Sequence, residues 1–93
     1  MKIEFDRKKS EKTFQERGLA FEDVPLLSWE RAIIQPDTRR EYGEERMIAF
    51  VPDARIRLHV VGFTMRGDTF WIFSFRKAND REVKNYGEKT AHG

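Results

Sequence analysis

The chain is short and its charges are nearly balanced. It has 93 residues and a mass of 11.1 kDa, with 18 lysines and arginines against 16 aspartates and glutamates. This length fits one small domain, residues 1–93, and excludes two. The 13% of aromatic residues argues against a disordered charged chain and for a packed core.

The amino-acid composition argues against several kinds of protein and site. The absence of cysteine removes a disulfide framework and thiolate metal sites, and two histidines leave little for a zinc site. We therefore expect neither a metal nor a cofactor. The first residues lack the apolar run of a signal peptide, and no stretch reaches the roughly 18 apolar residues of a membrane span. We expect a cytoplasmic protein that does not enter a membrane.

The N-terminal part predicts a short strand followed by two helices. Residues 2–5 alternate polar and apolar side chains. Asp6 is a good N-cap for a helix over about residues 7–17, which the following glycine ends. Apolar residues indicate a second, shorter helix over about residues 21–27, whose proline is tolerated only in the first turn.

The rest of the chain predicts a sheet and a final helix. Four β-prone segments follow one another at residues 29–35, 44–51, 55–64 and 69–75. Asn79 and Glu82 have capping-box spacing, which predicts a helix over about residues 80–86, with residues 87–93 as a frayed tail. The expected fold class is α+β: an antiparallel sheet of about four strands, two N-terminal helices packed on one face, and a short C-terminal helix.

Positive charge is concentrated in residues 54–81. This segment holds six basic residues against two acidic ones, a net charge of +4, and five of the six are arginine. The planar donor fork of arginine suits phosphate better than the point charge of lysine. The alternative is a solvated surface whose long side chains cover apolar neighbours.

The most unusual stretch is the predicted loop at residues 37–46, which holds four acids, three arginines and a tyrosine. Tyr42 can donate or accept a proton, and Glu44 can act as a base or orient an arginine. Three cations can clamp a phosphodiester: Arg39, Arg40 and Arg46. The alternative is that the acids simply neutralise the arginines in a surface hairpin.

A second cluster lies at residues 74–79, where the last strand leads into the last helix. The two-residue period of a strand places Ser74 and Arg76 on one face. The free N–H groups of the helix that follows also favour anions. The alternative is a capped helix whose arginine pairs with a nearby carboxylate.

One histidine and three aromatic residues leave two interpretations open. His59 titrates near neutrality and is a candidate acid or base, although a lone strand histidine is more often structural. Trp71, Phe73 and Phe75 are predicted to alternate on one strand face. Core packing under the N-terminal helices is the favoured role for these rings, and stacking on RNA bases is the alternative.

Two motifs in this order resemble the BrnT family of toxins from type II toxin-antitoxin pairs. They read D-x-R…Y-G-E-x-R over residues 37–46 and S-x-R-K-A over residues 74–78. With flanking matches, the resemblance extends from about Ile3 to Tyr86. It implies a RelE-like fold and a metal-independent endoribonuclease that inhibits translation without a cofactor. In such enzymes the 2′-hydroxyl of the RNA attacks the adjacent phosphate.

The resemblance also implies a partner and a set of site residues. The partner is a BrnA-type antitoxin, which forms a hetero-oligomer with the toxin. The toxin is expected to reach operator DNA only indirectly, through this antitoxin. The implied catalytic residues are Arg39, Arg40, Tyr42, Glu44, Arg46, Arg66 and Arg76. Further contacts to the RNA are expected from Arg57, Lys77 and Arg81.

The chain departs from the family pattern at three positions. Thr13 stands where asparagine is expected, Arg17 stands where histidine commonly precedes the glycine, and Pro25 interrupts the second helix. Altered activity is therefore one possibility. Two other functions stay open from the sequence: a nucleic-acid-binding module that cuts nothing, and a domain whose basic face only receives an antitoxin.

Overall fold

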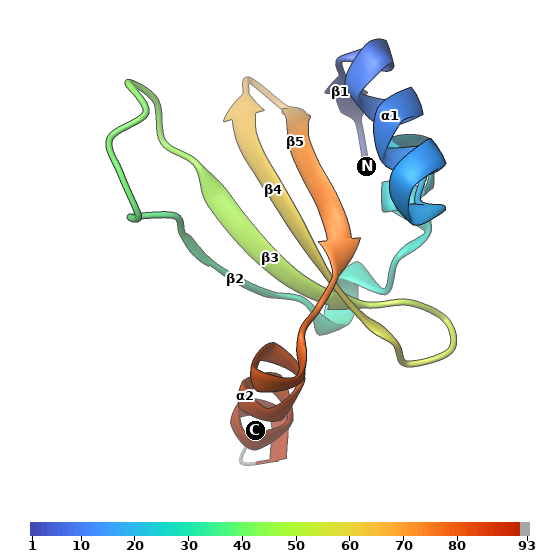
Figure 1. The fold of residues 1–93 in the computed structure, drawn as a ribbon. Helices are drawn as coiled ribbons and strands as arrows, with labels where there is room; N and C mark the ends of the chain where they lie inside the picture. The colour runs from blue at the N-terminus through green and yellow to red at the C-terminus, as the bar shows by residue number, and fades with distance from the viewer. Residues whose placement is uncertain (92–93) are drawn as a thin grey trace.

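The computed structural model describes residues 1–91, and its centre is a five-stranded sheet in the order β1-β5-β4-β3-β2 (Figure 1). The strands are β1 (Ile3–Phe5), β2 (Ile33–Pro36), β3 (Met47–Pro52), β4 (Leu58–Arg66) and β5 (Thr69–Lys77). Neighbouring strands are antiparallel except for β1, which runs parallel to β5.

The antiparallel pairing predicted for four strands is confirmed for β2 to β5, but the sheet has a fifth strand, β1, and that strand is parallel to its neighbour. The leading strand joins the sheet edge, with Ile3 opposite Phe70 and Phe5 opposite Ile72. A strand of three residues has too little surface to be stable alone. Pairing with β5 lets its two apolar residues pack against the core, which explains why it forms a fifth strand.

The first helix, α1 (Arg7–Arg17), forms as predicted. The Asp6 carboxylate accepts hydrogen bonds from the N–H groups of Lys8 at 2.9 Å and Lys9 at 3.3 Å. Gly18 ends the helix with a φ of 71°, in the left-handed region that favours glycine. Both signals read from the sequence are confirmed.

The second predicted helix is a 3₁₀ helix, η1 (Phe21–Leu26), because Pro25 lies inside it and removes a backbone donor. The strand predicted over 29–35 begins with another 3₁₀ turn, η2 (Trp29–Arg31), and only its second half is β2. The indole Nε1 of Trp29 donates to the carbonyl of Val24 at 2.8 Å, which holds this turn against η1.

The 3₁₀ segments and the residues that flank them cover the sheet, and α1 packs outside them. Ser10 is the one buried residue of α1, and Phe14 is 57% exposed. The prediction that two helices pack on one face is correct only for the second of them. The core combines these segments with one sheet face: Phe21, Val24, Leu27, Ala49, Val51, Val61, Phe63, Ile72 and Phe75. We call this face of the sheet the core face and the opposite one the groove face.

Two predicted strands begin too early. Glu44–Arg46 belongs to the loop, and β3 starts at Met47. Residues 53–57 form a turn because the Asp53 carboxylate accepts from the N–H groups of Arg55 at 2.8 Å and Arg57 at 3.0 Å. Side-chain bonding of this kind competes with strand pairing, so β4 starts only at Leu58.

Strand β5 contains an irregularity that decides which side chains reach each face. Gly62 of β4 pairs with Ser74, but the next residue, Phe63, pairs with Ile72. Phe73 is therefore an extra residue, as in a β-bulge, and the alternation of β5 shifts by one position there. A Cβ on Gly62 would lie 2.5 Å from Oγ of Ser74, so only glycine at position 62 leaves room for the serine side chain on the paired strand.

The bulge corrects one prediction and confirms another. Trp71 and Phe73 do not share a face with Phe75, which is 3% exposed and belongs to the core. Core packing is thus the role of Phe75 alone among these three rings. Ser74 and Arg76 do share a face, because they pair with Gly62 and Val60 of β4.

The last helix, α2 (Asp80–Ala91), is longer than predicted. The capping box is confirmed, with Asn79 N–H to Glu82 Oε1 at 2.9 Å and Glu82 N–H to Asn79 Oδ1 at 2.8 Å. The Tyr86 hydroxyl donates to the Arg31 carbonyl at 2.6 Å and ties the middle of the helix to η2. A frayed tail from residue 87 is therefore wrong for residues 87–91, and residues 92–93 lie outside the described part.

Neither α1 nor α2 is long and apolar enough to cross a bilayer.

The pH dependence of stability tests the packing of His59, which is 4% exposed on the core face. Burial lowers the pKa of His59 below its ordinary value of 6.5, and the nearby Asp53 offsets part of this effect. Protonation of His59 therefore favours the unfolded chain. The neutral His59 side chain contributes its full stabilisation above pH 6.5, and this stabilisation is lost as the pH falls toward the lower pKa of the folded state. We expect His59→Gln to flatten this decline, measured by denaturant unfolding at several pH values. An unchanged slope would contradict a buried neutral imidazole.

Candidate functional site

A polar groove of about 590 Å³ lies on the groove face, between the loop at residues 37–46, α1 and the start of α2. Two acids line it, Asp37 and Glu82. Its lining also includes six cations: Lys9, Arg17, Arg39, Arg40, Arg46 and Arg76. We call it the basic groove. The surplus of positive charge gives it the electrostatic character of an anion-binding surface.

Asp37 anchors the loop that forms one wall of the basic groove. Its side chain is only 6% exposed, and its carboxylate accepts from Arg39 Nε at 2.9 Å and Nη2 at 2.8 Å. The Tyr42 hydroxyl donates to the same carboxylate at 3.1 Å. These donors hold the pKa of Asp37 far below its usual range, and the carboxylate raises the pKa of Arg39. The carboxylate thus stays ionised and orders the first part of the loop, as far as Tyr42.

Guanidinium groups and aromatic rings alternate along the groove. The Arg40 guanidinium lies 5.2 Å from the centre of the Tyr42 ring, and the Arg46 guanidinium lies 4.2 Å from the centre of the same ring. Arg46 is also 3.9 Å from the ring centre of Phe73, the residue at the β5 bulge. Cation–π contacts of this kind hold a guanidinium in place without neutralising its charge.

Arg46 is only weakly paired with a carboxylate. Its Nε is buried and makes no hydrogen bond, and the nearest carboxylate contact, to Glu44 Oε1, is 3.6 Å long. Two rings rather than a carboxylate therefore set its position. Such a group is prepared to accept an anion because no strong ion pair has to break first.

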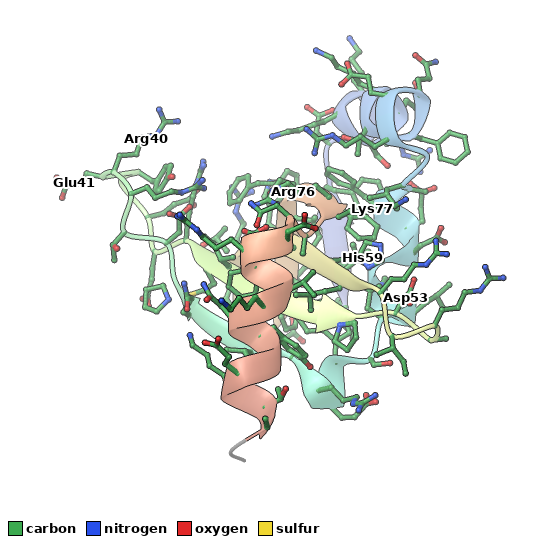
Figure 2. The ribbon with its side chains drawn as sticks, turned by 60° about the horizontal axis from the view of Figure 1, so that its bottom comes forward. Arg40, Glu41, Asp53, His59, Arg76 and Lys77 are labelled. Carbon is green, nitrogen blue, oxygen red and sulfur yellow. The ribbon has the colours of Figure 1, made fainter. Side chains whose placement is uncertain are left out.

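Arg76, by contrast, is already paired. Its Nη1 and Nη2 donate to the two carboxylate oxygens of Glu82 at 2.8 Å and 2.9 Å. This contact raises the pKa of Arg76 and lowers the pKa of Glu82. The pairing with a capped-helix carboxylate, left open from the sequence, is the arrangement observed. Figure 2 shows Arg76 beside the first turn of α2 and Arg40 at the tip of the loop.

The sequence did not single out the contribution of α1 to this groove. Lys9 and Arg17 both line it, and Thr13 lies between them on the helix. Their spacing of four residues places all three on one helical face. This spacing, together with the position of Arg17 just before the glycine that ends α1, is the sequence feature that could have indicated that α1 lines the site.

Several expected site residues lie elsewhere. Arg66 is over the ring of Trp71 at 4.4 Å, and its Nη2 is 3.9 Å from Glu44 Oε2. It lies six residues along β4 from Val60, the partner of Arg76, a separation of about 20 Å. Glu44 therefore bridges Arg46 and Arg66 outside the basic groove.

Three further expected RNA contacts are exposed but do not line the groove: Arg57, Lys77 and Arg81. By strand register Lys77 pairs with His59 and lies on the face opposite Arg76. His59 points to the core face, so it has no place in the groove. Among residues 1–91, no group of three or more histidines and acids is arranged to hold a metal ion.

Comparison with known proteins gives one decisive match. The family model described as the ribonuclease toxin BrnT of a type II toxin-antitoxin system matches residues 5–82. The chain belongs to the BrnT family. Membership of a toxin-antitoxin family implies an antitoxin partner and supports ribonuclease activity in general terms.

A solved structure agrees with this assignment to the BrnT family. The 1.1 Å crystal structure of the Brucella abortus ribonuclease toxin BrnT has a TM-score of 0.67 and 24% identity to this chain. The match covers 86% of this chain and 99% of the other, which shows a shared fold. A comparison with curated protein sequences found no match.

Removing the Asp37 anchor tests the order of the loop. We expect Asp37→Asn to lower the free energy of unfolding by about 1 kcal/mol, since the exposed Arg39 partner is screened by water. The folded-state pKa of Asp37 is depressed, so its stabilisation is full above 3.8 and is lost as the pH falls below that value. Denaturant unfolding at about pH 7 and pH 3 measures both effects.

Asp68→Asn is the matched control, because that carboxylate is 83% exposed and its one ion pair, to Lys2, is 3.7 Å long. It should change stability little at either pH. Equal losses in the two variants would show that Asp37 is no anchor.

Proposed function

We propose that this member of the BrnT family is a metal-independent endoribonuclease that cleaves cellular RNA, inhibits translation and is neutralised by a BrnA-type antitoxin. The observation that supports this proposal is the basic groove, where Arg46 is held between two aromatic rings and has only a long ion pair, 3.6 Å, to Glu44. A fixed guanidinium can stabilise a developing phosphorane charge without a metal ion.

The reaction proposed is an internal transfer within the RNA. The 2′-hydroxyl loses its proton and its oxygen bonds to the adjacent phosphorus, while the bond from phosphorus to the 5′ oxygen breaks. The products are a 2′,3′-cyclic phosphate and a 5′-hydroxyl, which takes up a proton. Arg40 and Arg46 are placed to stabilise the extra negative charge on the phosphate oxygens, because neither has a carboxylate within 3.5 Å among the described contacts.

The remaining expected catalytic residues divide by position. Tyr42 lines the groove between two guanidinium groups, so it is the better candidate for proton transfer than Glu44, which does not line it. Arg39 and Arg76 each hold a bidentate carboxylate contact, and we assign them to positioning of the RNA. Arg66 lies about 20 Å along β4 from Val60, the partner of Arg76, so we assign it to a part of the RNA that Arg76 does not contact.

Cleavage of bulk cellular RNA by purified, antitoxin-free protein in excess EDTA is the direct test. We expect products that end in 2′,3′-cyclic phosphate. Arg46→Ala and Arg40→Ala should each reduce the rate by about 100-fold, because each removes a charge that stabilises the transition state. The measurement is the rate of product formation on gels, with identification of the product ends.

Arg55→Ala provides the matched control, since Arg55 is an exposed arginine in the 53–57 turn, away from the groove. It should cleave like the wild type. No cleavage by a folded wild-type protein, on either free RNA or translating ribosomes, would disprove the endonuclease. Salt-sensitive RNA binding without products would then favour a non-catalytic binding module.

Freeing Arg76 should strengthen RNA binding at the expense of stability. Glu82→Gln removes the negative charge that neutralises Arg76 but keeps an amide oxygen that can accept from Asn79 N–H in the capping box. We expect tighter binding of an uncleavable 2′-O-methyl RNA, with a slope of log affinity against log salt that is steeper by about 0.7. The free energy of unfolding should decrease by about 1 kcal/mol. Glu88→Gln, on the same helix but outside the groove, should change neither quantity.

A further inference from the structure

A second groove lies on the core face of the sheet, at the part of β2, β3, β4 and β5 that the 3₁₀ segments do not cover. It has a volume of about 500 Å³, and the ring of Trp29 from η2 packs behind two of its lining residues, Phe63 and Phe70. We call it the apolar groove. Its lining is Ile34, Glu44, Glu45, Met47, Phe63, Thr64, Met65 and Phe70.

The surface of this groove is unusually apolar for an exposed part of a small protein. Ile34 is 47% exposed and Met65 is 45% exposed, although the other core-face residues of β4, the strand of Met65, are buried. Contiguous exposed apolar side chains with a polar rim are typical of a protein-protein contact. Leu26 is 75% exposed as well, but it lies at a separate, smaller pocket of about 330 Å³ whose lining includes charges of both signs, among them Asp53 and Arg55.

The rim of the apolar groove is acidic. Glu44 and Glu45 are its only charged lining residues, and no cation is among them. Glu45 makes no ion pair within the described contacts, and the two contacts of Glu44, to Arg46 and Arg66, are 3.6 Å and 3.9 Å long. These carboxylates therefore retain capacity for a closer cationic partner.

We propose that the apolar groove is the docking site for an amphipathic segment of the antitoxin that carries apolar side chains and a lysine or arginine facing Glu44 and Glu45. The proposal rests on the proposed function only in calling the partner an antitoxin. A nucleic acid does not fit, because the rim has the wrong sign. A second copy paired about a two-fold axis fits poorly, because the two acidic rims would face each other.

This position couples the antitoxin to the basic groove through one loop. Glu44 lines the apolar groove, and its neighbour in the ion pair, Arg46, lines the basic groove on the other side of the sheet. A cation from the antitoxin that draws Glu44 away changes the electrostatic surroundings of the stacked Arg46.

Charge introduced into the groove tests the site. In a titration of purified protein with its BrnA-type antitoxin, Met65→Glu should weaken the affinity by about tenfold or more, since an apolar anchor is lost and like charges are added. Because Met65 is 45% exposed, this variant should remain folded and keep its RNA cleavage. Ile34→Glu, at 47% exposure, is the second variant and should behave alike.

Two controls separate this proposal from others. Leu26→Glu introduces the same charge at a 75% exposed leucine away from the groove and should bind the antitoxin like the wild type. Arg40→Ala should also keep its antitoxin affinity while losing cleavage. Wild-type affinity in both groove variants, or loss of affinity in Arg40→Ala alone, would overturn the proposal and place the antitoxin on the basic groove.

Self-association is the remaining alternative outcome. If light scattering shows a dimer that Met65→Glu dissociates, the groove is an interface between two copies and the proposal fails. Affinity for the antitoxin is measured independently of RNA cleavage, so a protein that binds the antitoxin through the groove but cuts no RNA would refute the endonuclease and leave the docking site standing.

Discussion

Six cations lie around one groove of a 93-residue chain, and their mutual repulsion constrains much of the surrounding structure. Carboxylates compensate two of them: Asp37 holds Arg39, and Glu82 holds Arg76. Aromatic rings hold Arg40 and Arg46 without neutralising them. The loop at residues 37–46 contributes two of these groups, Asp37 and Tyr42, while the β5 bulge contributes Phe73 and the first turn of α2 contributes Glu82. The groove therefore keeps a positive surplus while its arginines stay fixed.

Local signals in the sequence predicted the elements that local chemistry decides. Asp6, Gly18 and the Asn79–Glu82 capping box set helix ends with hydrogen bonds to residues at most four positions away, and all three are confirmed. The parallel pairing of β1 with β5 joins residues more than 60 positions apart, and no periodicity encodes it. The extra length of α2 depends similarly on a bond from Tyr86 to the distant Arg31.

The candidate site shows the same division. The motif at residues 37–46 located the loop and its arginines, because their charges are unusual in composition alone. The sequence gave no indication of which acid pairs with which arginine, since those choices depend on the fold. It also gave no indication that Phe73 would hold Arg46, because strict alternation placed that ring on the same face as Phe75. Separation of Arg66 from Arg76 follows from strand geometry and could not be read from proximity in sequence.

The bulge at Phe73 also gives β5 one more side chain on the groove face than a regular strand of the same pairing would have. Before the bulge the even-numbered residues face the core, and after it the odd-numbered ones do, so Phe73 and Ser74 come between the core residues Ile72 and Phe75. Deletion of Phe73 would restore regular pairing and leave Phe75 and Arg76 on their present faces, because each would keep its partner on β4. The loss would be the ring that lies 3.9 Å from the Arg46 guanidinium. The extra residue thus serves the groove and not the core, so a shortened β5 would keep the fold and lose one support of Arg46.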